Sequence, residues 1–137
     1  MRYLLDTNVC IAVLNGKSPH IEGRLVKELR AKSQLFVSSV AAFELWYGGA
    51  KSARRSANTQ QLTAFFANWV ILLSFEEQDA HAAGEIRAEM ESVGKPIGAY
   101  DLLIAGQALR HEMTLVTANA REFGRVKNLQ WQDWSKG

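Results

Sequence analysis

Cysteine, proline and histidine are all scarce in this chain. Its 137 residues include one cysteine, two prolines and three histidines. A single thiol, Cys10, excludes both an internal disulfide and a cysteine-rich zinc site. Cys10 is therefore expected to be a small core residue.

Long apolar runs are also missing. The longest apolar stretches, residues 9–14 and 69–73, are far shorter than the roughly 20 residues that span a bilayer. Near the N-terminus, Asp6 stands where a secretory signal would need an unbroken apolar segment. We therefore expect a cytoplasmic protein that does not enter the membrane.

The composition is that of a folded protein. Hydrophobic residues make up 47% of the chain and charged residues 22%, which excludes a disordered or collagen-like chain. The length favours one domain over residues 1–137. A chain of this size buries about two-thirds of its surface on folding, so it needs no disulfide or metal to hold its core.

The formal net charge of +2 hides an asymmetry. Residues 1–60 carry nine Lys or Arg and four Asp or Glu, whereas residues 61–137 carry seven and ten. Two interpretations fit: solvated helix faces of opposite sign, or a basic surface for a polyanion. Charge alone permits binding to nucleic acid without establishing it.

Short apolar segments alternate with stretches of helical periodicity. The segments that favour strands are residues 3–5, 35–37, 70–75, 115–116 and 129–131. The pair Gly48-Gly49 predicts the end of a helix, and residues 49–58 predict a loop or a frayed helix start. Residues 102–110 are apolar nearly all round, which is typical of a buried central helix. The alternation predicts βαβ units and a parallel sheet.

Polar side chains follow the predicted strands or open the helices after them. They are Asp6, Ser38, Glu44, Asp101, Thr117 and Asn119. The carboxyl ends of parallel strands share one edge of a sheet, where sites in such folds lie. Three carboxylates from distant parts of the chain are therefore expected to converge.

Converging carboxylates repel one another, so either one keeps a proton or a cation lies between them. Oxygen ligands without a cysteine cluster or a histidine pair favour Mg²⁺ or Mn²⁺. Such a site is suited to metal-assisted phosphodiester hydrolysis. Taken singly, each acid is better explained structurally: Asp6 and Asp101 as helix caps, and Glu44 as a solvated helix residue. Taken together, they favour the metal site.

At this point the sequence resembles a known family. Four patterns, which span essentially the whole chain in order, are similar to those of PIN-domain ribonucleases, specifically toxins of the VapC type. They are Leu4-Leu5-Asp6-Thr7-Asn8; Ser38-Ser39-Val40 with Phe43-Glu44-Leu45; Pro96-Ile97-Gly98 with Asp101-Leu102-Leu103-Ile104-Ala105; and Leu115-Val116-Thr117-Ala118-Asn119 with Arg121-Glu122-Phe123.

The resemblance implies a three-layer α/β/α sandwich and a Mg²⁺- or Mn²⁺-dependent endoribonuclease. It implies that Asp6, Glu44 and Asp101 are the acidic metal-site residues. Many PIN domains have a fourth acid where this chain has Asn119, whose amide binds water or an ion without adding charge. Glu122 either compensates for that missing acid or belongs to a surface helix turn.

Three further residues are supporting candidates for the site. Thr117 is expected to position Asp6 or a water molecule through its hydroxyl group. Asn8 either holds a metal-bound water or caps a helix, and Ser38 is a weaker candidate. The three separated histidines, His20, His81 and His111, argue against histidine-pair acid–base chemistry.

A cluster of aromatic and basic residues follows Glu44. For Trp46 and Tyr47, the sequence leaves open packing between helices, a groove for a partner helix, or a surface on which RNA bases stack. Lys51, Arg54 and Arg55 either contact phosphates or solubilise a loop.

The resemblance implies a structured RNA substrate, with tRNA expected and ribosomal RNA as the alternative. Cleavage by an activated water leaves a 5′-phosphate and a 3′-hydroxyl. The family also implies a small antitoxin, a toxin homodimer and a toxin–antitoxin hetero-oligomer.

Two other functions stay open: a non-catalytic RNA-binding module of the same fold, and a phospho-receiver signalling domain. The receiver interpretation is disfavoured because Asp6 has no acidic neighbour and residues 70–75 contain no aspartate.

Overall fold

Five short strands form one parallel sheet in the computed structural model, which describes residues 1–136. Every pair of neighbouring strands is parallel. The spatial order is β3-β2-β1-β4-β5. The strands are β1 (Arg2–Leu5), β2 (Gln34–Ser38), β3 (Ile71–Leu73), β4 (Thr114–Val116) and β5 (Trp131–Gln132).

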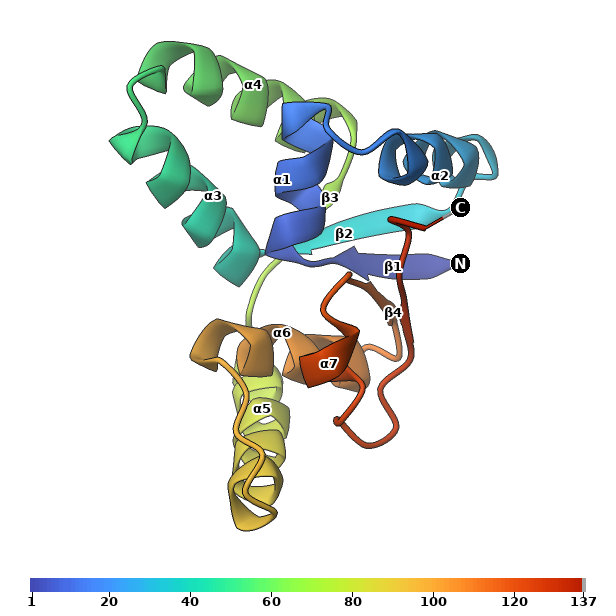
Figure 1. The fold of residues 1–137 in the computed structure, drawn as a ribbon, viewed down its shortest axis with the longest axis vertical. Coiled ribbons are helices and arrows are strands. Elements are labelled where there is room, and N and C mark those ends of the chain that lie inside the picture. Colours follow the sequence, from blue (N-terminus) through green and yellow to red (C-terminus); the bar gives the residue numbers. More distant parts are fainter. Residues whose placement is uncertain (137) are drawn as a thin grey trace.

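Helices cover both faces of this sheet (Figure 1). One layer holds α1 (Thr7–Asn15), α2 (Pro19–Arg30), α3 (Ser39–Lys51) and α4 (Arg55–Asn68). The other holds α5 (Glu77–Ser92), α6 (Ala99–Arg110) and α7 (Ala120–Phe123). Right-handed crossovers explain the division, because the chain moves from β1 to β3 in one direction and then returns to β4 and β5. The expected three-layer α/β/α sandwich is confirmed.

The two directions of winding meet between β1 and β4. Such a switch point opens a crevice at the carboxyl ends of the strands. The chain is firmly held there: the Asp6 N–H donates to the Val116 carbonyl at 3.1 Å, and the Thr117 N–H donates to the Gln132 carbonyl at 2.9 Å. Asp6 and Thr117 therefore start from adjacent backbone positions.

Helix α6 lies at the centre of the second helical layer. Its residues Ile104, Ala105 and Ala108 are completely buried, as predicted for an all-apolar helix. It begins at Ala99, earlier than the apolar run suggested, which places Asp101 in its first turn. Cys10 is also completely buried, in agreement with its expected core role, and burial raises the pKa of its thiol.

The prediction that Gly48-Gly49 ends a helix was wrong. Helix α3 continues to Lys51. A Cβ atom on Gly49 would lie 3.3 Å from Leu62 Cδ1, so this glycine lets α3 and α4 approach each other. Helix α4 starts at Arg55, which reduces the predicted loop over residues 49–58 to a short connection.

An ion pair between α5 and α6 was also not foreseen. Asp79 is completely buried, accepts a hydrogen bond from the Glu76 N–H at 2.8 Å and pairs with Arg110. Burial raises the pKa of Asp79, but the hydrogen bond from Arg110 and its charge bring the net pKa below the ordinary value. The pair ties the start of α5 to the end of α6.

None of the helices in residues 1–136 is both long enough and apolar enough to cross a membrane.

The crossing of α5 over α6 generates a stability prediction. A Cβ atom on Gly106 would lie 2.8 Å from the Ala83 backbone nitrogen, closer than real contacts allow. We expect Gly106→Ala to lower the free energy of unfolding by about 1–3 kcal/mol in urea denaturation, because the helices must separate. The matched control is Gly84→Ala in α5, where no atom lies within 4 Å of the added Cβ. That variant should be neutral or stabilising by up to about 1 kcal/mol. Equal effects at both glycines would contradict the proposed close crossing.

Candidate functional site

Asp6 sits at the carboxyl end of β1 and is 4% exposed. Its Oδ1 accepts the Val9 N–H at 2.8 Å and thereby caps α1. Burial raises the pKa of Asp6, and the Glu44 charge adds to this effect, while hydrogen bonds from the Thr117 hydroxyl and the Val9 N–H oppose it. The cap interpretation is therefore correct for one oxygen, and the carboxylate also takes part in a wider acidic cluster.

Glu44 reaches the same edge from the second turn of α3. It is half-buried, and its Oε1 accepts a hydrogen bond from Thr7 Oγ1 at 2.8 Å. This contact joins the first turn of α1 to α3. In the sequence, Thr7 stands within the motif around Asp6, but it was given no role in the site. Its position directly after Asp6 was the available signal for a role in the site.

Asp101 contributes the third carboxylate from the first turn of α6. Its pKa is raised to about 7, first by burial and then by the neighbouring carboxylates of Glu122, Asp6 and Glu44. Four acids from four separate segments therefore share one electrostatic environment. Asp6, Glu44 and Asp101 therefore lie close together at this edge of the sheet, as the sequence predicted, and Glu122 joins them.

Asn119 and Glu122 form a pair at α7. The Asn119 Nδ2 donates to Glu122 Oε2 at 2.8 Å, and the Asn119 N–H donates to Thr117 Oγ1 at 2.9 Å. Burial raises the pKa of Glu122, but hydrogen bonds with Asp101 and Asn119 outweigh it and leave the pKa below the ordinary value. Of the two coupled carboxyls, Asp101 therefore has the higher pKa and holds a proton more readily than Glu122.

The charge of Arg125 helps lower the pKa of Glu122, but no cation is ion-paired with the cluster in the part of the chain that the structure describes. Among residues 1–136, no ion pair involves Asp6, Glu44, Asp101 or Glu122. The described side chains also form no ready-made cluster of three or more His, Cys, Asp or Glu around a metal position. The donor set, four carboxylates that repel one another, nevertheless fits a hard divalent ion such as Mg²⁺, which binds through few carboxylates and keeps several waters.

The remaining polar candidates, Asn8 and Ser38, are not part of the carboxylate cluster itself. Asn8 is exposed in the first turn of α1 and does not cap it, since Asp6 does, so the cap interpretation of Asn8 was wrong. Ser38 is completely buried, and its Oγ accepts the Val40 N–H at 3.0 Å, which caps α3. Its hydroxyl oxygen is thus already engaged in holding the helix that carries Glu44.

The basic candidates are exposed at the far end of α3 and the start of α4. Lys51 lies two helical turns, about 10 Å, beyond Glu44 along the helix axis. Its ammonium group sits 4.8 Å from the centre of the Tyr47 ring. Arg54 lies in the α3–α4 connection and Arg55 is the first residue of α4. This connection points away from α6 and α7 (Figure 1).

The aromatic residues of α3 divide into two groups. Trp46 stacks on Phe66 of α4 with ring centres 6.2 Å apart, which supports the interpretation of helix packing. Tyr47 is 59% exposed. Phe43 and Tyr100, the neighbours of Glu44 and Asp101, form an exposed edge-to-face pair 6.0 Å apart that sequence reasoning missed.

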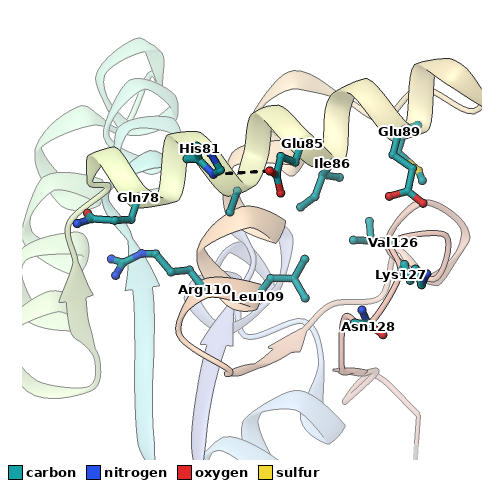
Figure 2. Close-up of a pocket in the computed structure, with 12 residues that line it drawn as sticks. Gln78, His81, Glu85, Ile86, Glu89, Leu109, Arg110, Val126, Lys127 and Asn128 are labelled. Carbon is teal, nitrogen blue, oxygen red and sulfur yellow. Dashed lines mark ion pairs between the residues drawn. The ribbon is translucent and has the colours of Figure 1, made fainter.

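A separate groove of about 650 Å³ lies between α5, the end of α6 and residues 126–128 (Figure 2). Its apolar floor includes Ile86, Leu109 and Val126, and Glu85 and Lys127 stand on opposite walls. None of the four clustered acids lines it. This hollow is therefore distinct from the carboxylate site at the strand ends.

Comparison with known proteins matches residues 3–129 to the PIN domain family model. The chain is 35% identical to a protein named tRNA(fMet)-specific endonuclease VapC from Salmonella typhimurium, over 98% of each chain. It is 37% identical to ribonuclease VapC2 of Rickettsia felis, over 99% of this chain and 100% of that one.

Solved structures agree with these sequence matches. The chain resembles one in the crystal structure of VapBC2 from Rickettsia felis bound to a promoter DNA fragment, with a TM-score of 0.90 and 34% identity. That match covers 98% of this chain and 99% of the other. A DNA-bound VapBC from Salmonella typhimurium gives the same TM-score and identity, with 98% coverage of both chains.

The raised pKa of Asp101 generates a prediction for the metal-free protein. A carboxyl whose pKa rises from 3.8 unfolded to about 7 folded stabilises the fold at low pH, and this contribution is lost as the pH rises through 7. We expect the free energy of unfolding of Asp101→Asn, measured in urea, to exceed that of wild type by about 1–2 kcal/mol at pH 8. At pH 4.5 the two proteins should be nearly equally stable. The control Asp133→Asn should lack this pH-dependent gain, because the pKa of Asp133 is lowered. A gain at Asp101 that is independent of pH would contradict the assignment.

Proposed function

The chain belongs to the PIN-domain family, and from this premise we propose that it is a divalent-metal-dependent endoribonuclease acting as the toxin of a toxin–antitoxin pair. The observation that carries the proposal is the cluster of four carboxylates at the sheet's switch point, which has no cation paired to it among residues 1–136. We further propose that residues 1–137 act as a single domain in the cytoplasm.

The metal site is assigned to Asp6, Glu44, Asp101 and Glu122. A Mg²⁺ or Mn²⁺ ion bound there supplies an activated water and stabilises charge on the leaving oxygen. The hydrogen bond from the Val9 N–H holds Asp6, and Thr7 orients Glu44. To serve as a ligand, the Asp101 carboxyl would have to be ionised, so a cation held there would displace its proton. Hydrolysis by water leaves a 5′-phosphate and a 3′-hydroxyl.

To Glu122 we assign the role of the fourth acid, which Asn119 does not supply. The half-buried Glu122 side chain supplies the negative charge that the amide at 119 lacks, and its ionised state follows from the hydrogen bonds it receives. This weakens the case for a non-catalytic module that has kept the fold. The receiver interpretation also loses support, because β3 ends at Leu73 followed by Ser74, with no acid to accept a phosphoryl group.

The proposed substrate is tRNA. Relatives that share about a third of their residues with this chain over its full length are named tRNA(fMet)-specific endonucleases, so initiator tRNA is the first candidate. Unpaired, splayed nucleotides of a loop suit a protein with so small a reading surface. The exposed Phe43–Tyr100 pair and Tyr47 offer aromatic faces next to the carboxylates.

The proposed partner is a small antitoxin. The structural relatives at about 34% identity are VapBC complexes. An apolar cavity of about 400 Å³ between α1, α2 and α4, lined by Val13, Leu25 and Phe65 among others, is of the kind that receives an amphipathic segment. We propose that the toxin also pairs with itself and that the antitoxin joins such dimers.

The proposal is tested by cleavage of purified tRNA with end-mapping of the products. Asp6→Asn and Glu122→Gln should each lower the cleavage rate at least about a hundredfold, because each removes a charge that holds the metal. The control is Glu85→Gln, which changes a side chain of α5 that is 75% exposed. Its cleavage rate should equal that of wild type.

Excess chelator should stop wild-type cleavage and added Mg²⁺ or Mn²⁺ should restore it. Full activity of Asp6→Asn, or of wild type in chelator, would refute the proposed chemistry.

The exposed basic residues at the end of α3 and the start of α4 generate a second prediction. If Lys51, Arg54 and Arg55 bind phosphates, changing all three to Gln should weaken RNA binding by inactive Asp6→Asn protein. The slope of log affinity against log salt should fall by about 0.7 for each phosphate that is no longer neutralised. The control changes three cations of the α2 region, Lys27, Arg30 and Lys32, to Gln and removes the same net charge. An equal decrease of slope in both triple variants would assign the effect to overall charge instead.

A further inference from the structure

Asn119 occupies the N-cap position of α7 but does not cap it. A helix-capping asparagine normally accepts a backbone N–H through its side-chain oxygen, and here no such bond forms. The side chain instead donates through Nδ2 to Glu122 Oε2 at 2.8 Å. The Asn119 amide group is thus directed at a carboxylate of the acidic cluster.

The backbone of Asn119 is equally well placed for this contact. Its N–H donates to Thr117 Oγ1 at 2.9 Å, and Thr117 is completely buried at the end of β4. The Asn119 side chain therefore projects from a fixed point of the sheet. Glu122, one turn further along α7, has a longer side chain with more rotatable bonds, so it is the member of the pair whose position needs fixing.

An ionised carboxylate only accepts hydrogen bonds, so the group at position 119 that contacts Glu122 must be a donor. Glu122 also accepts hydrogen bonds from Asp101 and from the Gly98 N–H, while Asp6 and Glu44 add negative charge to the same cluster. A carboxylate at 119 would oppose Glu122 with a like charge, whereas the amide neutralises none of its charge and still orients it. Asn119 and Glu122 thus behave as a complementary pair.

We propose that Asn119 is a positioning residue that holds the Glu122 carboxylate toward Asp101, and that Glu122 rather than Asn119 contacts the metal. This inference rests on the proposed function, because it assigns roles within the same site. It differs from the expectation for position 119, where the amide itself would bind the ion or its water.

A double-mutant cycle on Mn²⁺ affinity tests the proposal without RNA. Binding of Mn²⁺ alone is measured by titration calorimetry or by the electron paramagnetic resonance signal of the free ion. The proteins are wild type, Asn119→Ala, Glu122→Gln and the double variant. Asn119→Ala should weaken Mn²⁺ binding about tenfold, as is typical when a residue that orients a ligand is removed. In the Glu122→Gln background the same change should alter affinity less than twofold, since there is no carboxylate left to orient.

Additive effects in the cycle would overturn the positioning role and assign Asn119 as an independent ligand. The matched control is Asn68→Ala, which removes an exposed asparagine that bonds to its own helix; its Mn²⁺ affinity should equal that of wild type. Asn119→Ala must unfold within the range of the control, because a general disruption of the fold at α7 would also overturn the proposal.

Failure of the proposed function would look different. It would appear as wild-type protein that binds no Mn²⁺, or that binds it equally well after Asp6→Asn. If Mn²⁺ binding depends on Asp6 but the effects of the two substitutions add, only the role of Asn119 is rejected.

Discussion

Electrostatic repulsion among carboxylates held at one edge of a parallel sheet is the constraint around which this molecule is organised. Asp6, Glu44, Asp101 and Glu122 come from four segments and lie close enough to help raise the pKa of Asp101 to about 7. Repulsion of this kind must be balanced by a proton or a cation. Without metal a proton on Asp101 provides the balance, and a divalent ion would replace it.

The fold holds these charges together with a hydrogen-bond donor for each of three carboxylates. The Val9 N–H serves Asp6, the Thr7 hydroxyl serves Glu44 and the Asn119 amide serves Glu122. The donors to Asp6 and Glu122 lie on the same segment as their acceptors, and Thr7 reaches Glu44 from the adjacent helix α1, so these three carboxylates are held by the protein itself. Preorganisation of this type reduces the cost of binding a cation at a negatively charged site.

Helix α6 links the stability of the fold to the site. The close crossing at Gly106 and Ala83 and the buried Asp79–Arg110 pair fix α6 against α5. The first turn of α6 is then directed at the ends of β1 and β4, where Asp101 lies. Burial of the Asp101 carboxyl at that position is the largest cause of its raised pKa, ahead of the neighbouring carboxylates.

The chain's residues reveal a large part of this arrangement when taken alone. Alternating apolar segments and helical periodicities predict a parallel sheet, and the positions of Asp6, Glu44 and Asp101 after strands predict their convergence, because both depend on local patterns and on the direction of parallel strands. The all-apolar residues 102–110 likewise predict a buried α6. The Gly48-Gly49 pair wrongly predicted the end of a helix, because α3 continues past both glycines. Gly49 instead permits close packing between α3 and α4.

Other features depend on contacts between segments distant in the sequence, which no local pattern encodes. The scarcity of cysteine and the absence of a histidine pair already limited any metal site to oxygen ligands. Only the tertiary structure decided that Glu122 joins the cluster and that Thr7 orients Glu44. Asn119 and Glu122 lie three residues apart, and the structure shows which of two local contacts forms: the amide bonds to Glu122 and does not cap α7. The physical reason is that a side chain's type and spacing determine what it can bond, whereas its actual partner is determined by how the helices pack around the sheet.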